Sequence, residues 1–488
     1  MIKENEEDFI NLSGLQQKYI ITFLIALVCS AFAYGFELSN HTISIDVDVM
    51  DNYLHTIDLG RWGHAILKRF VFHEPWVPFF SLVFSLICIS AASVASSIYL
   101  KLTKEESIIF SSLFVTFPQM AYQLQFSNQA ETVGLALLLS VYSMIFFDNG
   151  SRSGKAIFIL LNIFVISIYQ SFVFLPITLL SINHLKLSLT EKSGWKSWIC
   201  NSIILSLLSV VSVTIYLIIS KQVKSYYHIN DVSYFAALIA WGKMSAIDAI
   251  IGVYKFILYN CYLVTWYGFN LYFLTAISIV VVVLSSLKFG IKKAAFTLFL
   301  SIIVLLCPFI LNILIGAGTP ARTLSQMPIV FAATVTMGVM WFSNKTLRLI
   351  STLIIAISSC AYVNMLFYSD KVAEDQTKYL SQQLMTDIYH SYPEKMQYET
   401  PVYFSGRIKI QNPWRQNGSD EFGISFLERG ESDRVGNYIR NTGMANIIQV
   451  GKYSISNEQK LALRTMPSWP SSGSIKDVAG TVLVKLSN

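Results

Sequence analysis

The chain has 488 residues, of which 53% are hydrophobic and 14% are charged, and its mean hydropathy is +0.51. A soluble protein carries roughly a quarter charged residues, so most of this surface is expected to face lipid. The net charge of +6 is modest and does not suggest nucleic acid as a partner, because lysines and arginines in cytoplasmic loops can account for it. These values exclude an ordinary soluble domain and indicate a polytopic membrane protein.

Residues 1–18 are expected to form a cytoplasmic leader, because they are acidic and no small-residue cleavage site follows the apolar run. A membrane-spanning helix needs about 20 apolar residues, and on this basis the region 19–369 is expected to hold about eleven helices. The fifth and sixth are short and meet at Tyr169-Gln170, so they are also compatible with a hairpin that does not cross fully. The expected spans are 19–36, 76–100, 107–124, 130–147, 156–170, 171–183, 198–219, 270–287, 294–315, 325–342 and 349–368.

Lysines and arginines mark five short loops, which all fall on one side if eleven spans are counted. That side is assigned to the cytoplasm by the positive-inside rule. The first long loop, 37–76, and the tail, 370–488, are then expected outside. Lys221 and Lys224 depart from the rule, because they lie between the seventh and eighth spans on the predicted outer side. Either the count is wrong there, or these cations serve an anionic ligand.

The tail, 370–488, has a different composition, with 14 Lys+Arg and 13 Asp+Glu. Apolar positions at helical spacing predict a helix over 371–391. Strands are expected at Pro401–Ile410, Ile447–Val450 and Thr481–Leu486. The predicted fold is therefore a polytopic α-helical membrane protein with a small α/β C-terminal domain, which the orientation above makes periplasmic.

The loop 37–76 carries six acidic residues and four of the seven histidines. Asp46-Val-Asp48 has the form of a metal-binding D-x-D element of nucleotide-sugar enzymes, but nucleotide sugars are cytoplasmic and this loop is predicted outside. Residues 46 and 48 share a face in a strand, whereas 48 and Asp51 share one in a helix. Close carboxylates repel, which favours one of them as a general base. The alternative is a solvated loop that is acidic without a catalytic role.

Two arginines are candidate ligands for a phosphate. Arg322 ends the turn 316–322, and arginine binds phosphate in a bidentate manner; the alternative is an arginine that reaches from a helix end to the interface. Arg61 either pairs with Asp58 or binds a phosphate, and its neighbour Trp62 suits an anchor at the headgroup level.

Further polar side chains lie at the predicted outer ends of spans, among them Glu131 and the Tyr169-Gln170 pair. They either bind sugar hydroxyls or connect neighbouring helices. The histidine spacing matches no compact metal motif, although carboxylates could hold a divalent cation. No P-loop, GxGxxG, HExxH or GxSxG in a suitable context is present, so no ATP or NAD site is expected.

This layout, with its acidic first loop, Gly60-Arg61-Trp62, outer Arg322 turn and outer C-terminal domain, resembles the Gtr type II serotype-converting glucosyltransferases. These bacterial or bacteriophage-borne enzymes of the GT-C superfamily modify the O-antigen of lipopolysaccharide. The resemblance implies a bacterial inner-membrane enzyme with a cytoplasmic N-terminus and a periplasmic C-terminal domain. It also implies an undecaprenyl phosphate glucose donor, an O-antigen acceptor, and two functional partners, a donor synthase and a donor-lipid flippase.

The resemblance further assigns roles to residues. The base is expected to be Asp46 or Asp48, with Glu37 and Asp51 as second candidates. The donor phosphate is expected to bind Arg322, followed by Lys221, Lys224 and Arg61. Sugar binding is expected from Glu131, Gln170, Tyr169 and Trp62, and no metal ligand or further cofactor is assigned. Direct attack on the anomeric carbon would invert its configuration.

Two alternative functions are a transporter of a lipid-linked sugar and an O-antigen polymerase or ligase. A transporter or flippase for a lipid-linked sugar would usually show internal repeats and broken helices at the midplane, and no repeat is visible. An O-antigen polymerase or ligase would rely on arginines in large outer loops, whereas the first loop here has six carboxylates against Arg61, Lys68 and Arg69.

Overall fold

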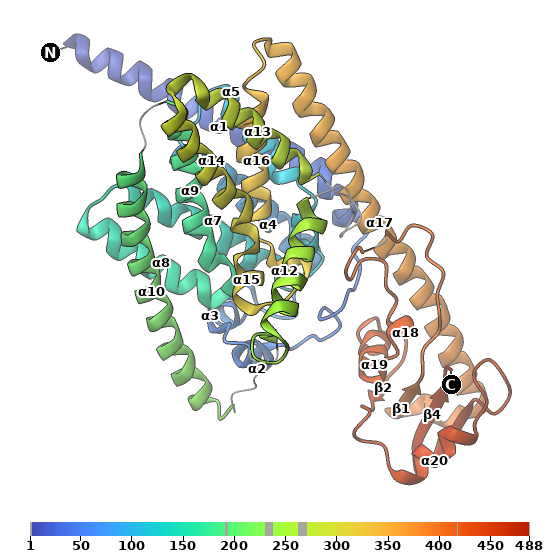
Figure 1. The fold of residues 1–488 in the computed structure, drawn as a ribbon. Helices are drawn as coiled ribbons and strands as arrows, with labels where there is room; N and C mark the ends of the chain where they lie inside the picture. Colours follow the sequence, from blue (N-terminus) through green and yellow to red (C-terminus); the bar gives the residue numbers. More distant parts are fainter. Residues whose placement is uncertain (1, 191–193, 230–237, 262–270, 417, 488) are drawn as a thin grey trace. The chain divides into compact units, whose positions relative to one another are not determined.

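The computed structural model describes residues 2–190, 194–229, 238–261, 271–416 and 418–487 (Figure 1). The chain divides into two compact units. The first, here called the membrane unit, comprises Met1–Leu38 and Asn52–Asn364. The second, the C-terminal unit, comprises Ser39–Asp51 and Met365–Asn488. Ser39–Asp51, which the sequence prediction places in the first long loop, thus belongs to the C-terminal unit.

The membrane unit is built from helices. Those of its first half are α1 (Ile2–Ser39), α2 (Tyr53–Asp58), α3 (Trp62–Leu67), the π-helix η1 (Lys68–Phe72), α4 (Pro78–Tyr99), α5 (Lys104–Thr116), α6 (Gln119–Leu124), α7 (Ala130–Asp148) and α8 (Arg152–Ile168). The second half contains η2 (Gln170–Phe174), α9 (Leu175–Ser188), α10 (Trp195–Tyr226), α12 (Ala246–Cys261), α13 (Phe273–Ser286), η3 (Leu287–Phe289), α14 (Ile291–Leu306), η4 (Cys307–Phe309), α15 (Ile310–Ile315), η5 (Ala321–Thr323) and α16 (Met327–Val339). The last helix, α17 (Lys345–Ser391), continues into the C-terminal unit.

Within the described residues, seven helices are long and apolar enough to cross a membrane. They are Gln16–Ser39, Pro78–Tyr99, Ala130–Asp148, Gln170–Ser188, Trp195–Tyr226, Ile291–Ile315 and Lys345–Ser391. The polytopic helical fold is thereby confirmed, and every expected span overlaps a helix. The sixth expected span, 171–183, lies within one of these seven helices, Gln170–Ser188. The fifth, 156–170, corresponds to α8, which has only 17 residues and is not among the seven. The expected span 107–124 is divided into α5 and α6, because Pro118 forces Phe117 into an extended conformation (ψ 126°).

Helices α4 and α7 pack closely in the interior of the membrane unit (Figure 1). A side chain at Gly134 would place its Cβ 2.7 Å from the Ser85 hydroxyl, so glycine is needed for this approach. The buried face of α4 carries small serines, of which Ser93, Ser96 and Ser97 donate to carbonyls of their own helix. Small residues of this kind allow neighbouring helices to approach within van der Waals contact in lipid.

The C-terminal unit contains a four-stranded sheet with the order β2-β1-β4-β3. Strand β1 (Thr400–Ser405) pairs in parallel with β2 (Ile447–Gln449) and β4 (Thr481–Lys485), and β3 (Ile475–Val478) is antiparallel to β4. Buried side chains of β1, β4 and α17 form one core with α18 (Phe426–Arg429) and α19 (Ser432–Asn441). The remaining helices are η6 (Pro393–Gln397) and α20 (Asn457–Thr465).

The expected α/β character of this tail is confirmed by the sheet and its helices. Strand β1 stops at Ser405 rather than at Ile410, because Gly406 turns the chain at a positive φ of 86°. Strand β3 and the short helices were not predicted. Their sequences are short and rich in polar residues, so they show little apolar periodicity.

Candidate functional site

Helix α6 and the turn η5 bring polar groups together inside the membrane unit. Gln119 and Gln123 are one helical turn apart on α6 and share a face. The Gln119 amide donates to the Ala321 carbonyl at 2.8 Å, and the Tyr169 hydroxyl donates to the Arg322 carbonyl at 3.4 Å. Two side chains from distant parts of the sequence therefore fix the backbone that carries Arg322.

The Arg322 guanidinium lies over the Phe126 ring, 4.3 Å from its centre. Among the residues that the structure describes, no carboxylate pairs with it. The side chain lines a small pocket, here called the Arg322 pocket. Its walls are Ser85, Ile89, Gln119, Met120, Gln123, Leu124, Val133, Gly134, Leu137, Phe172, Arg322 and Ser325. A cation without a counter-charge in an apolar unit is suited to an anionic ligand.

The Arg322 pocket also contains polar atoms without a visible partner. Gln123 is 4% exposed, and within the described residues neither its amide nitrogen nor its amide oxygen has a hydrogen-bond partner. The same holds for the hydroxyl of Ser85. Buried polar groups are nearly always hydrogen-bonded, so these atoms mark a place where a ligand or water supplies the missing partner. The pocket thus offers a cation, an amide and a hydroxyl between apolar walls.

Arg61 forms a second polar centre of the membrane unit. Its Nε donates to Gln170 and its Nη1 to Gln129, each at 3.3 Å, and its guanidinium lies 4.9 Å from the centre of the Tyr169 ring. Trp62 packs beside it against the apolar cluster that contains Tyr216. The structure therefore brings together Arg61, Trp62, Tyr169 and Gln170, and the Tyr169 hydroxyl connects this centre to the backbone of Arg322.

Glu131 lies in the first turn of α7 and forms a buried ion pair with Lys68. The Lys68 Nζ lies 2.6 Å from Glu131 Oε1, and the two side chains are 3% and 1% exposed. The second carboxylate oxygen of Glu131 has no partner in the described parts of the chain. Next to this pair, His64 Nδ1 lies 2.7 Å from the Thr132 hydroxyl. Burial, with a smaller contribution from the Lys68 and Arg61 cations, lowers the pKa of His64 to about 3, so this imidazole is neutral at pH 7.

The four candidate bases have different environments. Asp46 and Asp48 belong to the C-terminal unit, where both pair with Arg434, at 3.1 and 3.0 Å. The Asp46 side chain is 48% exposed, whereas that of Asp48 is fully buried. Burial raises the pKa of Asp48, and the Arg434 cation opposes this shift. Glu37 is buried near the end of α1, and Asp51 is exposed.

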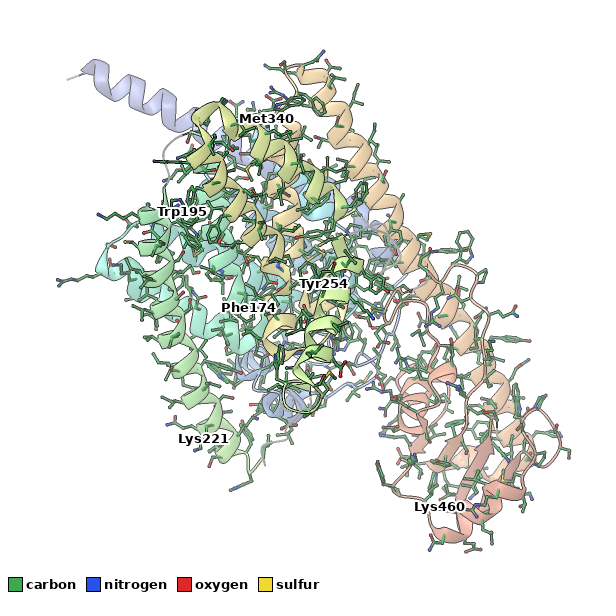
Figure 2. All side chains as sticks on the ribbon, in the orientation of Figure 1. Phe174, Trp195, Lys221, Tyr254, Met340 and Lys460 are labelled. Carbon is green, nitrogen blue, oxygen red and sulfur yellow. The ribbon has the colours of Figure 1, made fainter. Side chains whose placement is uncertain are left out.

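Lys221 and Lys224 lie at the C-terminal end of α10, where Figure 2 labels Lys221. Lys221 is exposed and Lys224 half-buried, and neither lines the Arg322 pocket. The described residues contain no group of three or more His, Cys, Asp or Glu side chains placed to hold a metal ion.

Sequence reasoning missed several of these groups. Ser85 and Ser325 gave no recognisable pattern, because buried serines are common in helices that pack closely. Lys68 was noticed only as a charge of the first loop, and nothing in the sequence predicted its partner Glu131, 63 residues away. Arg434 lies in a polar tail where one arginine does not stand out. The sequence did indicate polar side chains at the outer ends of spans, among them Glu131 and the Tyr169-Gln170 pair.

The helical architecture and the buried polar centres define a polytopic membrane protein with a candidate ligand site between its helices. No curated protein matches the chain. Residues 35–342 match the family described as Glucosyl transferase GtrII, and the chain belongs to this family. The match covers Arg61, Glu131, Gln170 and Arg322 and ends before α17. Membership implies that the protein is a membrane-embedded glucosyltransferase, in agreement with the resemblance found in the sequence.

Proposed function

We propose that this protein transfers glucose from undecaprenyl phosphate glucose to a sugar unit of the O-antigen, on the periplasmic side of the bacterial inner membrane. The glucosyltransferase family supports the transfer of a glucosyl group. The seven apolar helices support a donor that stays in the bilayer through its prenyl chain. The product would be a lipopolysaccharide of altered serotype.

The observation that carries this proposal is the charge environment of Arg322. Its guanidinium lines a pocket in the membrane unit and has no carboxylate partner among the described residues. A prenyl-linked sugar carries its phosphate at the level where the apolar chain meets the polar head. A guanidinium there can bind the phosphate in the ground state and stabilise the charge that develops as it leaves. Arg61 is a second phosphate candidate, and Lys221 and Lys224 follow it.

The reaction needs one further group, a base for the acceptor hydroxyl. The base removes the hydroxyl proton while the oxygen attacks the anomeric carbon, and the bond between that carbon and the phosphate oxygen breaks with its electron pair on the phosphate. The configuration at the anomeric carbon is inverted. Among the candidates, Asp46 is preferred, because its side chain is about half exposed (48%) while that of Asp48 is fully buried. Glu37 and Asp51 remain second candidates.

The sugar-binding roles expected for Glu131, Tyr169, Gln170 and Trp62 form part of the same proposal. Their support is that all four lie in the membrane unit, that Tyr169 and Gln170 contact Arg61, and that Trp62 follows Arg61 in the sequence. The donor would be made by a cytoplasmic synthase and moved across the membrane by a flippase. The proposal requires the N-terminus to lie in the cytoplasm and the C-terminal unit in the periplasm.

The proposal is tested by mass spectrometry of O-antigen from a strain that lacks the gene and carries wild-type, Asp46→Asn, Asp48→Asn or doubly substituted protein. Wild-type protein should add one hexose, identified as glucose, per acceptor unit, and Asp46→Asn should abolish the addition. Shortened O-antigen chains in the deletion strain would indicate a polymerase instead. Accumulation of donor lipid without any transfer would indicate a transporter. Full glucosylation by both single variants and by the double variant would exclude these two carboxylates as the base.

A further inference from the structure

The acidic segment Ser39–Asp51 belongs to the C-terminal unit, although the residues on either side of it belong to the membrane unit. The chain therefore leaves the membrane unit after α1, joins a unit formed mainly by residues from 365 onward, and returns at Asn52. A loop that was simply exposed to solvent would not need to pack against residues of the C-terminal unit. The contacts that hold this segment can be named atom by atom.

Helix α19 presents one polar face to the segment. Arg434, Asn437 and Asn441 follow at helical spacing and lie on the same side of α19. Arg434 Nη1 donates to Asp48 at 3.0 Å, and Nη2 donates to Asp46 at 3.1 Å. Asn437 donates to the other carboxylate oxygen of Asp48 at 3.4 Å, and Asn441 donates to the Asp48 carbonyl. One arginine therefore bridges both aspartates, and two asparagines complete the contacts of Asp48.

The arginine is itself oriented within α19. Its Nε donates to Glu431, three residues earlier, at 2.6 Å. All three nitrogens of the guanidinium are thus engaged by carboxylates, which fixes the plane of the group. The planar fork of arginine can bridge two carboxylates in this manner, whereas the single ammonium of lysine is a point charge.

The backbone of the segment also depends on these contacts. Asp46 adopts a left-handed conformation with φ of 68°, which is uncommon for a residue with a side chain. Asp48 is completely buried, and a buried carboxylate without a cation is strongly disfavoured. Loss of Arg434 would therefore remove the cation that balances the buried Asp48 and one contact of Asp46, whose left-handed backbone is uncommon.

We propose that Arg434 is a positioning residue for glucosyl transfer, because it fixes the acidic segment and with it the orientation of Asp46. The inference rests on the proposed role of Asp46 as the base. Arg434 lies beyond residue 342, where the family match ends. The residue that holds the acidic segment therefore lies outside the matched region, although Asp46 lies inside it.

The test uses the full-length protein in nanodiscs, with Arg434→Gln, Arg434→Lys and Arg440→Gln variants. Arg440 is the matched control, because it lies on the same helix, is 51% exposed and has its nearest carboxylate, Glu399, at 3.9 Å. Hydrogen–deuterium exchange of peptides covering 39–51 reports whether the segment is held. Steady-state transfer from undecaprenyl phosphate glucose to an O-antigen acceptor reports kcat and the KM for the donor.

Arg434→Gln should accelerate exchange in 39–51 and lower kcat by about 100-fold, the size expected when a reacting group is displaced by about 1 Å. The KM for the donor should change little, because the donor phosphate is assigned to Arg322. Arg434→Lys should be intermediate in both measurements, and Arg440→Gln should resemble wild type. Unchanged exchange in the strand 400–405 shows that the unit has folded.

Two results would overturn the proposal: exchange in 39–51 that does not respond to Arg434→Gln, or faster exchange with unchanged kcat. If the wild-type protein transfers no sugar at all, the proposed function fails, while the exchange measurement still decides whether Arg434 holds the segment.

Discussion

Arg322 in the membrane unit and Arg434 in the C-terminal unit show two uses of the same side chain. Arg434 contacts three carboxylates, those of Asp46, Asp48 and Glu431. Arg322 contacts an aromatic ring and, among the described residues, no carboxylate. A guanidinium whose charge is already compensated holds a structure together, whereas one whose charge is not compensated can take an anionic ligand. The presence or absence of carboxylates around an arginine therefore indicates its role better than its position in a loop does.

The comparison predicts a structural role for Lys68 in the membrane unit, because Glu131 already balances its charge. Lys68→Met leaves the Glu131 carboxylate buried without its partner, and should lower the free energy of unfolding by about 3–5 kcal/mol. The double variant Lys68→Met/Glu131→Met should recover most of this loss. Denaturant titration of the purified proteins in micelles measures the free energy of unfolding of both variants. A single variant as stable as wild type would contradict the assignment.

Arg322 has no carboxylate partner among the described residues, so its replacement should affect the reaction and not the stability of the protein. Arg322→Gln should reduce transfer by about 10²–10³-fold, because the charge on the leaving phosphate loses its stabilisation. The melting temperature should be nearly unchanged. Arg348→Gln is the control, since Arg348 already pairs with Glu105 at 3.2 Å. Equal activity of the two variants would remove Arg322 from the phosphate site.

The C-terminal unit should be sensitive to acid through His41, which lies in the acidic segment. Burial lowers the pKa of His41 from 6.5 to about 4, and Glu374 opposes this shift only in part. The unfolded chain therefore takes up this proton more readily, so stability is present above pH 6.5 and is lost as the pH falls toward 4. The loss between pH 7 and pH 5 should be about 2 kcal/mol.

The measurement is thermal unfolding of wild-type and His41→Gln protein at both pH values. The variant should show a flatter pH dependence than wild type. His390→Gln, at an exposed histidine of α17, serves as the control for the loss of an imidazole. A slope that is the same in all three proteins would show that His41 titrates equally in the folded and unfolded states.

The smallest effect is expected at Gln123. Gln123→Leu removes a buried amide that has no partner in the described residues, and should stabilise the free protein by about 1 kcal/mol. If the amide serves a ligand, the same variant should transfer glucose more slowly. Gln119→Leu, which breaks the bond to the Ala321 carbonyl, should instead destabilise the protein. Melting curves and initial rates of both variants distinguish a ligand-binding glutamine from a structural one.

Much of the fold could be predicted from the sequence, because hydropathy reports membrane helices directly. The α/β character of the tail was also visible, but strand β3 and helix α19 were not. The polar centres were predicted only as residue types at helix ends. Which of them meet depends on contacts between residues far apart in the sequence, such as Gln119 with the Ala321 carbonyl, 202 positions away. The proposed catalytic roles of Asp46 and Arg322 remain predictions for mutagenesis.

The contact between Asp48 and Arg434 joins residues 386 positions apart, and this separation sets the order of events during synthesis. At 5–20 residues per second, about 20–80 s pass between the emergence of the aspartate and that of its arginine. Throughout this interval the acidic segment has no docking surface, so it has to stay unstructured while the first helices insert. The acidic segment could then dock only after α19 has left the ribosome, and a chain terminated before α19 could not complete this contact.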